Sequence, residues 1–303
     1  MALAKQSTRG LYTATTTPMT SDGKLNLSAI GAQVDRQLRA GIAGIVAVGG
    51  TGEASALSVS ERVDVVGATV EAVAGRVPVL AGVTTPGLPD TLALGRACLE
   101  AGAKGLMVIT PYGTAPSQAG IRDYYKAVAD GVGRAVMLYD IPYLTLVATK
   151  PETVSEIADD GSIFAMKASN PDQAAFTWLV ELVGDKIAIM SGDEHLFAVQ
   201  VALGAVGGVL ASTNLLPKTW VQIFETARAG ELALAQQQIA RLHDFLVTVY
   251  AEPNPGPMKA AQALTGFDVG PVRLPNKAPD AALVSTMREQ LTELLAYEKA
   301  LAV

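Results

Sequence analysis

Short apolar segments alternate with helical patterns along the chain, and this repeat restricts the possible folds more than any other feature. The apolar segments are rich in β-forming residues and lie at residues 11–17, 44–48, 77–83, 105–109, 134–139, 162–167, 186–190 and 207–211. Alternating strands and helices imply a parallel sheet covered by helices. Eight such units predict an α/β fold of the (β/α)8 TIM-barrel type. A doubly wound open sheet is the alternative, but no Gly-x-Gly-x-x-Gly motif follows the first strand.

The intervening helices are predicted from apolar periodicity and from residues suited to helix ends, such as Ser28 before the first helix and Gly41 after it. They span residues 29–40, 60–74, 91–101, 117–129, 151–158, 172–183 and 193–203. Beyond residue 216 only helices are predicted, at 220–229, 231–250 and 281–300, with a Pro-rich link at 252–257. We therefore expect a barrel at residues 1–215 and a C-terminal helical region, residues 216–303, packed on it.

Charge and residue counts argue against several classes of protein. The 303-residue chain has a formal net charge of −6 and no Lys/Arg run, so a nucleic-acid partner is not expected. Cys98 is the only cysteine, which excludes an intramolecular disulfide and fits a reducing compartment. Two histidines, His195 and His243, are too few for a His-rich metal site, and no metal is predicted.

Neither a signal peptide nor a membrane span is predicted. Residues 1–10 contain no apolar core of the kind that signal peptides carry. No segment reaches the roughly 18 consecutive apolar residues that a membrane span needs. We expect a cytoplasmic protein without a membrane partner.

Lys167 stands at the end of the sixth predicted strand and is the strongest candidate for chemistry. Active sites of TIM barrels lie at the C-terminal ends of the strands. Burial at such a place disfavours the ammonium form and lowers the pKa of the lysine. An amine whose pKa lies near about 7–8 can attack a carbonyl and form a Schiff base. On this segment alone, a lysine that simply ends a strand and faces solvent is the simpler interpretation, and the rest of the chain is needed to favour the chemical one.

Two further strand ends carry polar groups suited to such a site. Tyr139 ends the fifth strand, and neighbouring strands lie about 4.8 Å apart, so its phenol and the Lys167 amine can meet. A positioned tyrosine can act as a general acid or base. The glycine-rich turn at residues 49–53 follows the second strand, and its backbone N–H groups can hold a carboxylate. The plain alternatives are an aromatic residue that packs and an ordinary tight turn.

These segments together resemble a known family. The motifs are Gly-Gly-Thr-Gly-Glu at 49–53, Tyr-Asp-Ile-Pro at 139–142, Lys167, Ser-Gly-Asp at 191–193 and Glu-Pro-Asn-Pro at 252–255. In this order, over nearly the whole chain, they are similar to those of the dihydrodipicolinate synthase/N-acetylneuraminate lyase family. The resemblance implies a (β/α)8 barrel with a C-terminal helical extension, a homotetramer and no metal or other cofactor. It also implies that a 2-oxo acid, most often pyruvate, forms a covalent imine with Lys167.

The resemblance assigns roles to individual residues. Lys167 would form the imine, Tyr139 would move protons, and Thr51 would bind the carboxylate of the 2-oxo acid and orient Tyr139. Tyr112, in a Thr-Pro-Tyr motif, and Leu210, through its backbone carbonyl, would contribute to substrate binding. Synthases commonly have a second tyrosine after this motif, which serves a neighbouring subunit. Gly113 stands there in this chain, which puts that relay in question.

Departures from the family pattern bear on the substrate. Gly50 replaces a threonine common in the family's loop, so the turn offers one hydroxyl fewer to a bound substrate. Leu144 occupies the position where synthases carry an arginine for the carboxylate of the aldehyde, and a bidentate carboxylate partner is thereby lost. Asp193 and Glu194 resemble the acidic pair that holds sugar hydroxyls in the lyase branch. Helix capping is the alternative role for this pair, because carboxylates favour helix N-termini.

The leading hypothesis from these features is a Schiff-base lyase or aldolase. It would make or break a C–C bond between a 2-oxo acid and an aldehyde, with a hydroxylated, sugar-acid-like aldehyde as the partner. The alternatives are 4-hydroxy-tetrahydrodipicolinate (dihydrodipicolinate) synthase and a 2-keto-3-deoxy sugar acid dehydratase. A barrel that binds a 2-oxo acid without catalysis is the alternative from a different class.

Overall fold

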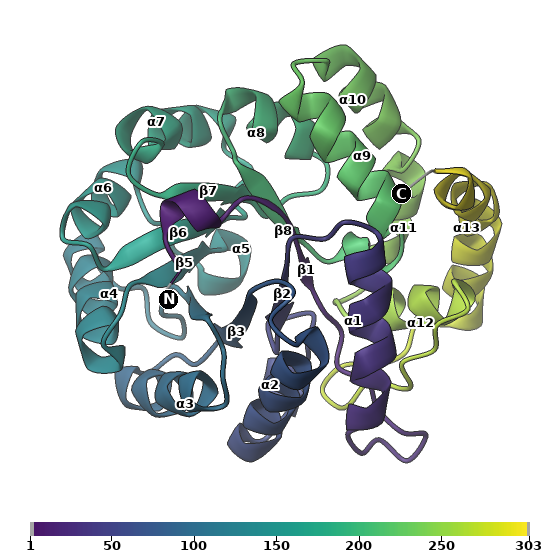
Figure 1. Cartoon of the computed structure of the whole chain (residues 1–303), viewed down its shortest axis with the longest axis horizontal. Helices are drawn as coiled ribbons and strands as arrows, with labels where there is room; N and C mark the ends of the chain where they lie inside the picture. Colours follow the sequence, from purple (N-terminus) through teal and green to yellow (C-terminus); the bar gives the residue numbers. More distant parts are fainter. Residues whose placement is uncertain (1–2, 302–303) are drawn as a thin grey trace.

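The computed structural model describes residues 3–301 and contains a closed barrel of parallel strands (Figure 1). The strands are β1 (Gly10–Ala14), β2 (Gly44–Ala47), β3 (Val79–Val83), β4 (Gly105–Ile109), β5 (Val136–Asp140), β6 (Ile163–Ala168), β7 (Ala188–Ser191) and β8 (Gly207–Leu210). They follow one another around the barrel in chain order, and β8 pairs with β1 to close it. The predicted TIM barrel is therefore confirmed.

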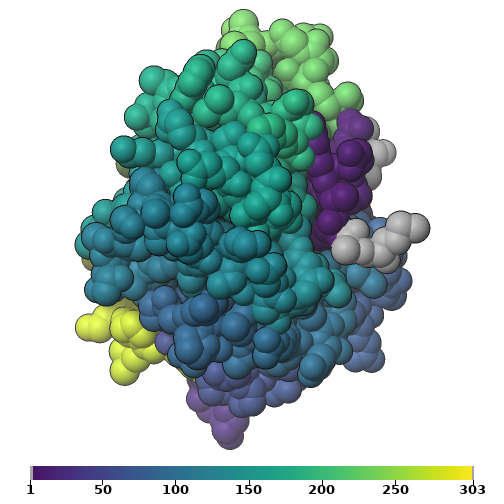
Figure 2. All heavy atoms as spheres, turned by 90° about the vertical axis from the view of Figure 1, so that its left-hand side faces the viewer, coloured from purple at the N-terminus to yellow at the C-terminus, as the bar shows by residue number. Residues whose placement is uncertain are grey.

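Helices connect successive strands and cover the outside of the barrel. They are α1 (Ile30–Arg39), α2 (Val59–Val73), α3 (Leu88–Glu100), α4 (Gln118–Val132), α6 (Pro151–Asp159), α7 (Gln173–Val183) and α8 (Phe197–Leu203). In a side view the blue and teal surface of these helices covers the strands, and purple N-terminal residues lie along one edge (Figure 2). No helix in the described part of the chain combines the length and the apolar character that crossing a membrane requires.

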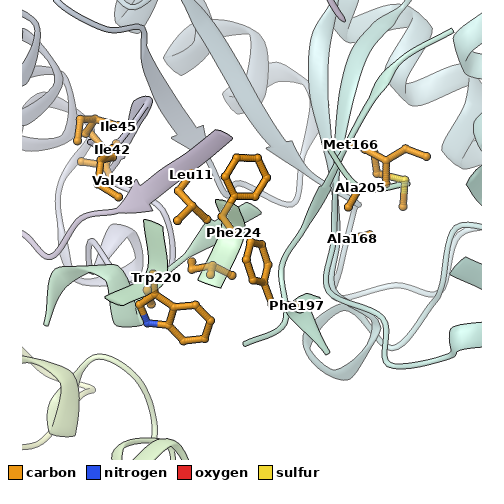
Figure 3. Close-up of a cluster of buried hydrophobic side chains, with 14 of the residues drawn as sticks. Leu11, Ile42, Ile45, Val48, Met166, Ala168, Phe197, Ala205, Trp220 and Phe224 are labelled. Atoms are coloured by element: carbon orange, nitrogen blue, oxygen red, sulfur yellow. The ribbon is translucent and has the colours of Figure 1, made fainter. Parts of the chain in front are cut away.

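The apolar core has two parts, because each strand is buried on both faces. One set of side chains fills the inside of the barrel, including Tyr12, Leu80 and Met107. The other lies between the strands and the helices. There the rings of Phe197 and Trp220 meet edge to face with centroids 5.8 Å apart (Figure 3). Both faces are apolar, which is why the strand sequences read as continuous apolar runs rather than alternating ones.

Some predicted boundaries are wrong. The first α-helix begins at Ile30 rather than at residue 29, after a 3-10 turn at Leu27–Ala29, and the Ser28 hydroxyl donates to Asn26 instead of capping it. The helix predicted at 193–203 begins only at Phe197. A short helix, α5 (Pro142–Thr145), follows β5 where none was predicted.

The helix predicted at 231–250 is in fact two helices, α10 (Leu232–Ala240) and α11 (His243–Val249). The break permits α10 to pack on α9 (Pro217–Arg228) and α8, while α11 packs on α13 (Ala281–Ala300). No glycine or proline marks the break, so it was not visible in the sequence. A further helix, α12 (Gly256–Leu264), begins within the segment that was predicted to be a rigid link.

The helices that follow β8 contact the barrel and one another. α9 packs against α8 and β1, and α13 lies beside α11 and α12 (Figure 1). Glu298 of α13 receives hydrogen bonds from the backbone N–H groups of Lys218 and Thr219 at 2.8 and 2.7 Å. The carboxylate thus satisfies free donors in the first turn of α9, whose N-cap residue has no capping side chain. The division of the chain at residue 215 stays a prediction.

A buried ion pair joins the C-terminal region to the turn after β2. Lys259 donates to the Glu53 carboxylate at 2.8 Å, and both side chains are nearly inaccessible, at 2% and 0% exposure. The Lys259 ammonium also donates to the carbonyl oxygens of Thr17 and Pro271, at 2.9 and 2.6 Å. Glu53 accepts in addition from the Arg273 backbone N–H at 2.8 Å. The pair and its partners therefore connect the segment at Thr17 and the turn at Glu53 to residues 259–273 of the C-terminal region.

Replacing Lys259 by methionine is expected to lower the free energy of unfolding by about 3–5 kcal/mol, because it leaves the Glu53 carboxylate buried without its counter-charge. Urea denaturation followed by circular dichroism measures the loss. Lys126→Met is the matched control, since Lys126 pairs with Asp130 at 3.5 Å on the exposed face of α4 and exposed pairs contribute little. Equal losses in the two variants would contradict this account of the buried pair.

Candidate active site

A cavity of about 380 Å³ opens at the C-terminal ends of the barrel strands. Its walls include Thr51 after β2, Tyr139 of β5, Lys167 of β6 and Glu194 after β7. Cavities of a few hundred cubic ångströms are of the size that binds small molecules. Its position agrees with the rule that TIM barrels place their active sites at this end.

The Lys167 side chain is buried at this cavity, with an exposed fraction of 8%. Burial lowers the pKa of its amine to about 8, and the Glu194 carboxylate opposes this shift. A substantial fraction of the amine is therefore neutral near pH 7–8, as a nucleophile requires. The solvent-facing alternative for this lysine is wrong.

Tyr139 lies directly beside Lys167 in the barrel. The two residues are register partners in the β5–β6 pair, so both side chains leave the sheet toward the same side. The Lys167 amine lies 4.5 Å from the centroid of the Tyr139 ring. Burial raises the pKa of the Tyr139 phenol above its usual range, so the phenol stays protonated and can donate a proton or a hydrogen bond.

Gly192 makes room for the lysine. A Cβ at this position would collide with the Ser169 hydroxyl and would lie 2.9 Å from Cε of Lys167. A side chain here would therefore have to shift the Ser169 hydroxyl and crowd the end of the Lys167 side chain. The packing of the site thus explains why the Ser-Gly-Asp motif has a glycine at position 192.

Thr51 is held by a residue from the C-terminal region. The side-chain amide of Asn254 donates to Oγ1 of Thr51 at 2.8 Å, and both residues line the cavity. Because Oγ1 accepts this bond, the proton of the Thr51 hydroxyl is available to a ligand. Thr51 can therefore donate to a carboxylate in the cavity, which is the role that the family resemblance implies and which stays a prediction.

Glu194 is a buried carboxylate whose Oε1 accepts several hydrogen bonds. The donors are the backbone N–H groups of Ala211 and Ser212 at 3.1 and 3.3 Å, the Ser212 hydroxyl at 3.1 Å and the Tyr250 hydroxyl at 2.7 Å. The two backbone donors follow β8, so the carboxylate ties the loop after β7 to the end of the neighbouring strand. Glu194 lines the cavity, but part of its bonding capacity is already used by the protein.

The other predicted substrate-binding residues divide into two groups. Gly50 and Leu144 line the cavity, Leu144 from the short helix α5. Tyr112, Asp193 and Leu210 do not line the cavity of this chain. The Tyr112 hydroxyl donates to the Thr84 carbonyl at 2.9 Å, and the Leu210 carbonyl accepts from the Thr213 hydroxyl at 2.8 Å. Asp193 caps its own turn by accepting from the backbone N–H groups of two following residues, at 2.9 and 3.0 Å.

Sequence reasoning missed Asn254, Tyr250 and Ser169 as parts of the cavity wall. Asn254 belonged to a recognised motif but was interpreted only as part of a link. Tyr250 lay inside a predicted helix without any motif, so no local signal marked it. Among the residues that the structure describes, no group of His, Cys, Asp and Glu side chains is arranged to hold a metal ion.

A buried amine and a tyrosine at the mouth of a (β/α)8 barrel define a class of enzyme, the Schiff-base or class I aldolases and lyases. The sequence profile of the dihydrodipicolinate synthetase family matches residues 7–296. The chain belongs to this family. Its enzymes use no cofactor and form the Schiff base on a lysine, so a catalytically silent barrel is disfavoured.

Curated relatives carry the name of the synthase. The chain is 36% identical to 4-hydroxy-tetrahydrodipicolinate synthase of Sorangium cellulosum over 96% of this chain and 97% of the relative. It is 33% identical to the enzyme of the same name from Methanoculleus marisnigri, over 93% of this chain and 98% of the relative. These names support the synthase alternative better than the leading hypothesis of a sugar-acid-like aldehyde.

Solved structures agree with the fold. The dihydrodipicolinate synthase of Aquifex aeolicus superposes with a TM-score of 0.91 at 28% identity and covers 95% of this chain and 98% of its own. A synthase from Acinetobacter baumannii, solved in complex with pyruvate, gives 0.89 at 28% identity, with 94% and 98% covered. A monomeric synthase variant gives 0.91 at 30% identity, with 96% and 98% covered.

The rate of imine formation is expected to rise with pH and to level off above about pH 8, because only the neutral amine attacks a carbonyl. Below the pKa the neutral fraction, and with it the rate, falls about tenfold per pH unit. Trapping the imine of pyruvate with borohydride at several pH values, with intact mass as the readout, measures the rate. A rate that still climbs tenfold between pH 9 and 10 would mean that the pKa is not lowered.

Replacing Asn254 by leucine is expected to raise the KM for pyruvate about fivefold, because a typical hydrogen bond contributes roughly 1 kcal/mol and Thr51 loses the bond that orients it. Steady-state kinetics or titration with pyruvate measures the change. Asn276→Leu is the matched control, since its side chain makes no hydrogen bond with the described residues. An unchanged KM in Asn254→Leu would contradict the orienting role.

Proposed function

We propose that this chain joins pyruvate to an aldehyde through an imine on Lys167, as a 4-hydroxy-tetrahydrodipicolinate synthase. The observation that carries the proposal is the Lys167 amine, buried beside Tyr139 with a pKa of about 8. Relatives of this name match over 93–96% of this chain.

The proposed reaction begins when the neutral Lys167 amine attacks the ketone carbon of pyruvate. The resulting carbinolamine loses water with Tyr139 as the proton donor, which leaves a protonated imine. Loss of a proton from the methyl carbon gives an enamine, and the imine nitrogen accepts the electron pair. The enamine carbon then attacks the aldehyde, and water releases the product from Lys167. The hydroxyl of Thr51 holds the pyruvate carboxylate throughout.

Aspartate semialdehyde is the proposed aldehyde, because it is the substrate of the synthases whose name the relatives carry. Support for it comes from the relatives rather than from the cavity wall. The homotetramer and the cytoplasmic location stay predictions, as does the dehydratase alternative.

One observation favours a second candidate, an aldolase for an aldehyde without a second carboxylate. Among the described residues that line the cavity, Lys167 is the only cation, and its nitrogen carries no charge in the enamine that attacks the aldehyde. Leu144 lines the wall at the position where the family's synthases carry an arginine. A carboxylate on the aldehyde would therefore meet no fixed positive charge here.

Borohydride reduction in the presence of pyruvate is expected to add one pyruvate-derived group to the protein and none to Lys167→Met. Intact mass measures the adduct, and peptide mapping locates it. Lys126→Met, on the exposed face of α4, is the matched control and should be labelled like the unchanged protein. No adduct on the unchanged protein would refute the proposed function.

The aldehyde is decided by a second assay with the same protein. Condensation with aspartate semialdehyde is compared with cleavage of a panel of 2-keto-3-deoxy sugar acids. Preferred turnover of the semialdehyde supports the synthase. Preferred cleavage of the sugar acids supports the second candidate and leaves the imine chemistry unchanged.

A further inference from the structure

Apolar side chains are exposed in the wall of the cavity that holds Lys167. Tyr143 and Leu144 of α5 line this cavity, and their exposed fractions are 70% and 57%. Pro253, which precedes α12, is a third exposed residue of the same wall. Single exposed apolar residues are common on protein surfaces, but several of them in one cavity wall mark a surface that a ligand covers.

The backbone that carries Tyr143 and Leu144 is fixed by the turn of α5. The backbone N–H groups of Leu144 and Thr145 donate to the Ile141 carbonyl at 3.0 and 3.1 Å. Thr145 is only 1% exposed, and its hydroxyl lies 3.1 and 3.0 Å from the carbonyl oxygens of Ile141 and Val147. Thr145 therefore anchors the turn in the protein, while the two residues before it remain exposed at the cavity.

Most polar side chains of the wall already have hydrogen-bond partners within the protein. These pairs are Tyr250 with Glu194 at 2.7 Å, Asn254 with Thr51 at 2.8 Å, and Ser169 with the Gly192 carbonyl at 3.2 Å. In the proposed reaction the 2-oxo acid occupies Lys167, Tyr139 and the remaining donor of Thr51. An aldehyde that enters next therefore meets few free polar groups, and the apolar surface of Tyr143 and Leu144 is available to it.

We propose that the preferred aldehyde of this cavity carries an uncharged apolar substituent, a branched alkyl or an aromatic group, that packs on Tyr143 and Leu144. This inference rests on the proposed function, since it needs the pyruvate imine on Lys167, and it names the substrate class of the second candidate. The enamine carbon forms a bond to the aldehyde carbon, and the electron pair of the C=O double bond moves to the oxygen, which takes a proton from Tyr139. Water then breaks the imine and releases a 4-hydroxy-2-oxo acid.

Charge and exposed surface favour the same class of substituent. An apolar group releases water from Tyr143 and Leu144, and this contribution grows with the apolar area that is covered. A carboxylate loses water without gaining a counter-charge, because the Lys167 nitrogen is neutral in the enamine and Glu194 is the other charged group among the described residues of the wall. In an apolar pocket, a difference of one methylene group already changes kcat/KM about tenfold or more.

Condensation of pyruvate with a panel of aldehydes tests the proposal. Benzaldehyde and 3-methylbutanal represent the apolar class, and succinic semialdehyde and aspartate semialdehyde carry a carboxylate. Both apolar aldehydes are expected to react with a kcat/KM at least about tenfold above that of either semialdehyde. Product formation at one fixed pyruvate concentration, followed by mass spectrometry, measures the rates. A higher kcat/KM for either semialdehyde would overturn this inference and leave the imine chemistry intact, whereas no borohydride-trapped pyruvate adduct would refute the proposed function itself.

Two variants of the wall locate the preference. In Leu144→Arg the ratio of kcat/KM for benzaldehyde to that for succinic semialdehyde should fall at least about 100-fold, because the apolar contact is lost and a guanidinium can bind the carboxylate. In Tyr143→Ser the same ratio should fall about tenfold without any added charge. The ratio is the readout because an effect on imine formation acts equally on both aldehydes and cancels.

Leu146→Arg is the matched control for Leu144→Arg. Leu146 directly follows α5, is 84% exposed and does not line the cavity, so the same new charge lies outside the site. Its ratio should stay within about twofold of that of the unchanged protein. An unchanged ratio in both Leu144→Arg and Tyr143→Ser, or an equal fall in Leu146→Arg, would overturn the assignment of this surface to the aldehyde.

Discussion

The structure depends on keeping one amine out of water at the mouth of the barrel. An ammonium group loses its hydration on burial, and no carboxylate forms an ion pair with Lys167 among the described residues. The pKa of the amine is lowered as a result, so more of it is neutral and able to attack a carbonyl. Strand pairing provides the burial, since β6 lies between β5 and β7. Gly192 provides the space, because a Cβ there would overlap the Ser169 hydroxyl and crowd the Lys167 side chain.

A second constraint connects the C-terminal region to the site. The Lys259–Glu53 pair joins α12 to the glycine-rich turn, and the same turn carries Thr51, which accepts its bond from Asn254 just before α12. Glu53 adopts a left-handed backbone conformation with φ of 58°, which is unfavourable for a residue with a side chain. The buried bonds to its carboxylate offset that cost. The helices after β8 thus complete the cavity wall rather than merely covering the barrel.

The sequence predicted the barrel and the central residues of the site because both follow from local patterns. Each strand is an apolar run with a turn after it, and the residue after each run is placed at one end of the barrel by the topology alone. Lys167 and Tyr139 were found in this way. Asn254 and Tyr250 could not be, because their partners, Thr51 and Glu194, lie 203 and 56 residues away and meet them only through tertiary packing. Tertiary packing also explains why the helix predicted at 231–250 is divided, because α10 and α11 pack on different helices.

This chain departs from the family pattern in the charge of the cavity wall. In the proposed reaction, imine formation depends on Lys167, Tyr139 and Thr51, which agree with the family pattern. Choice of the aldehyde depends on groups farther out, where Leu144 offers no charge and Glu194 offers a negative one. A carboxylate brought next to Glu194 would be repelled, whereas an ammonium or a hydroxyl would find an acceptor. An aldehyde that carries a hydrogen-bond donor near its reacting carbon therefore suits this wall. The amino group of aspartate semialdehyde is such a donor, whereas the carboxylate of the same molecule would be repelled by Glu194.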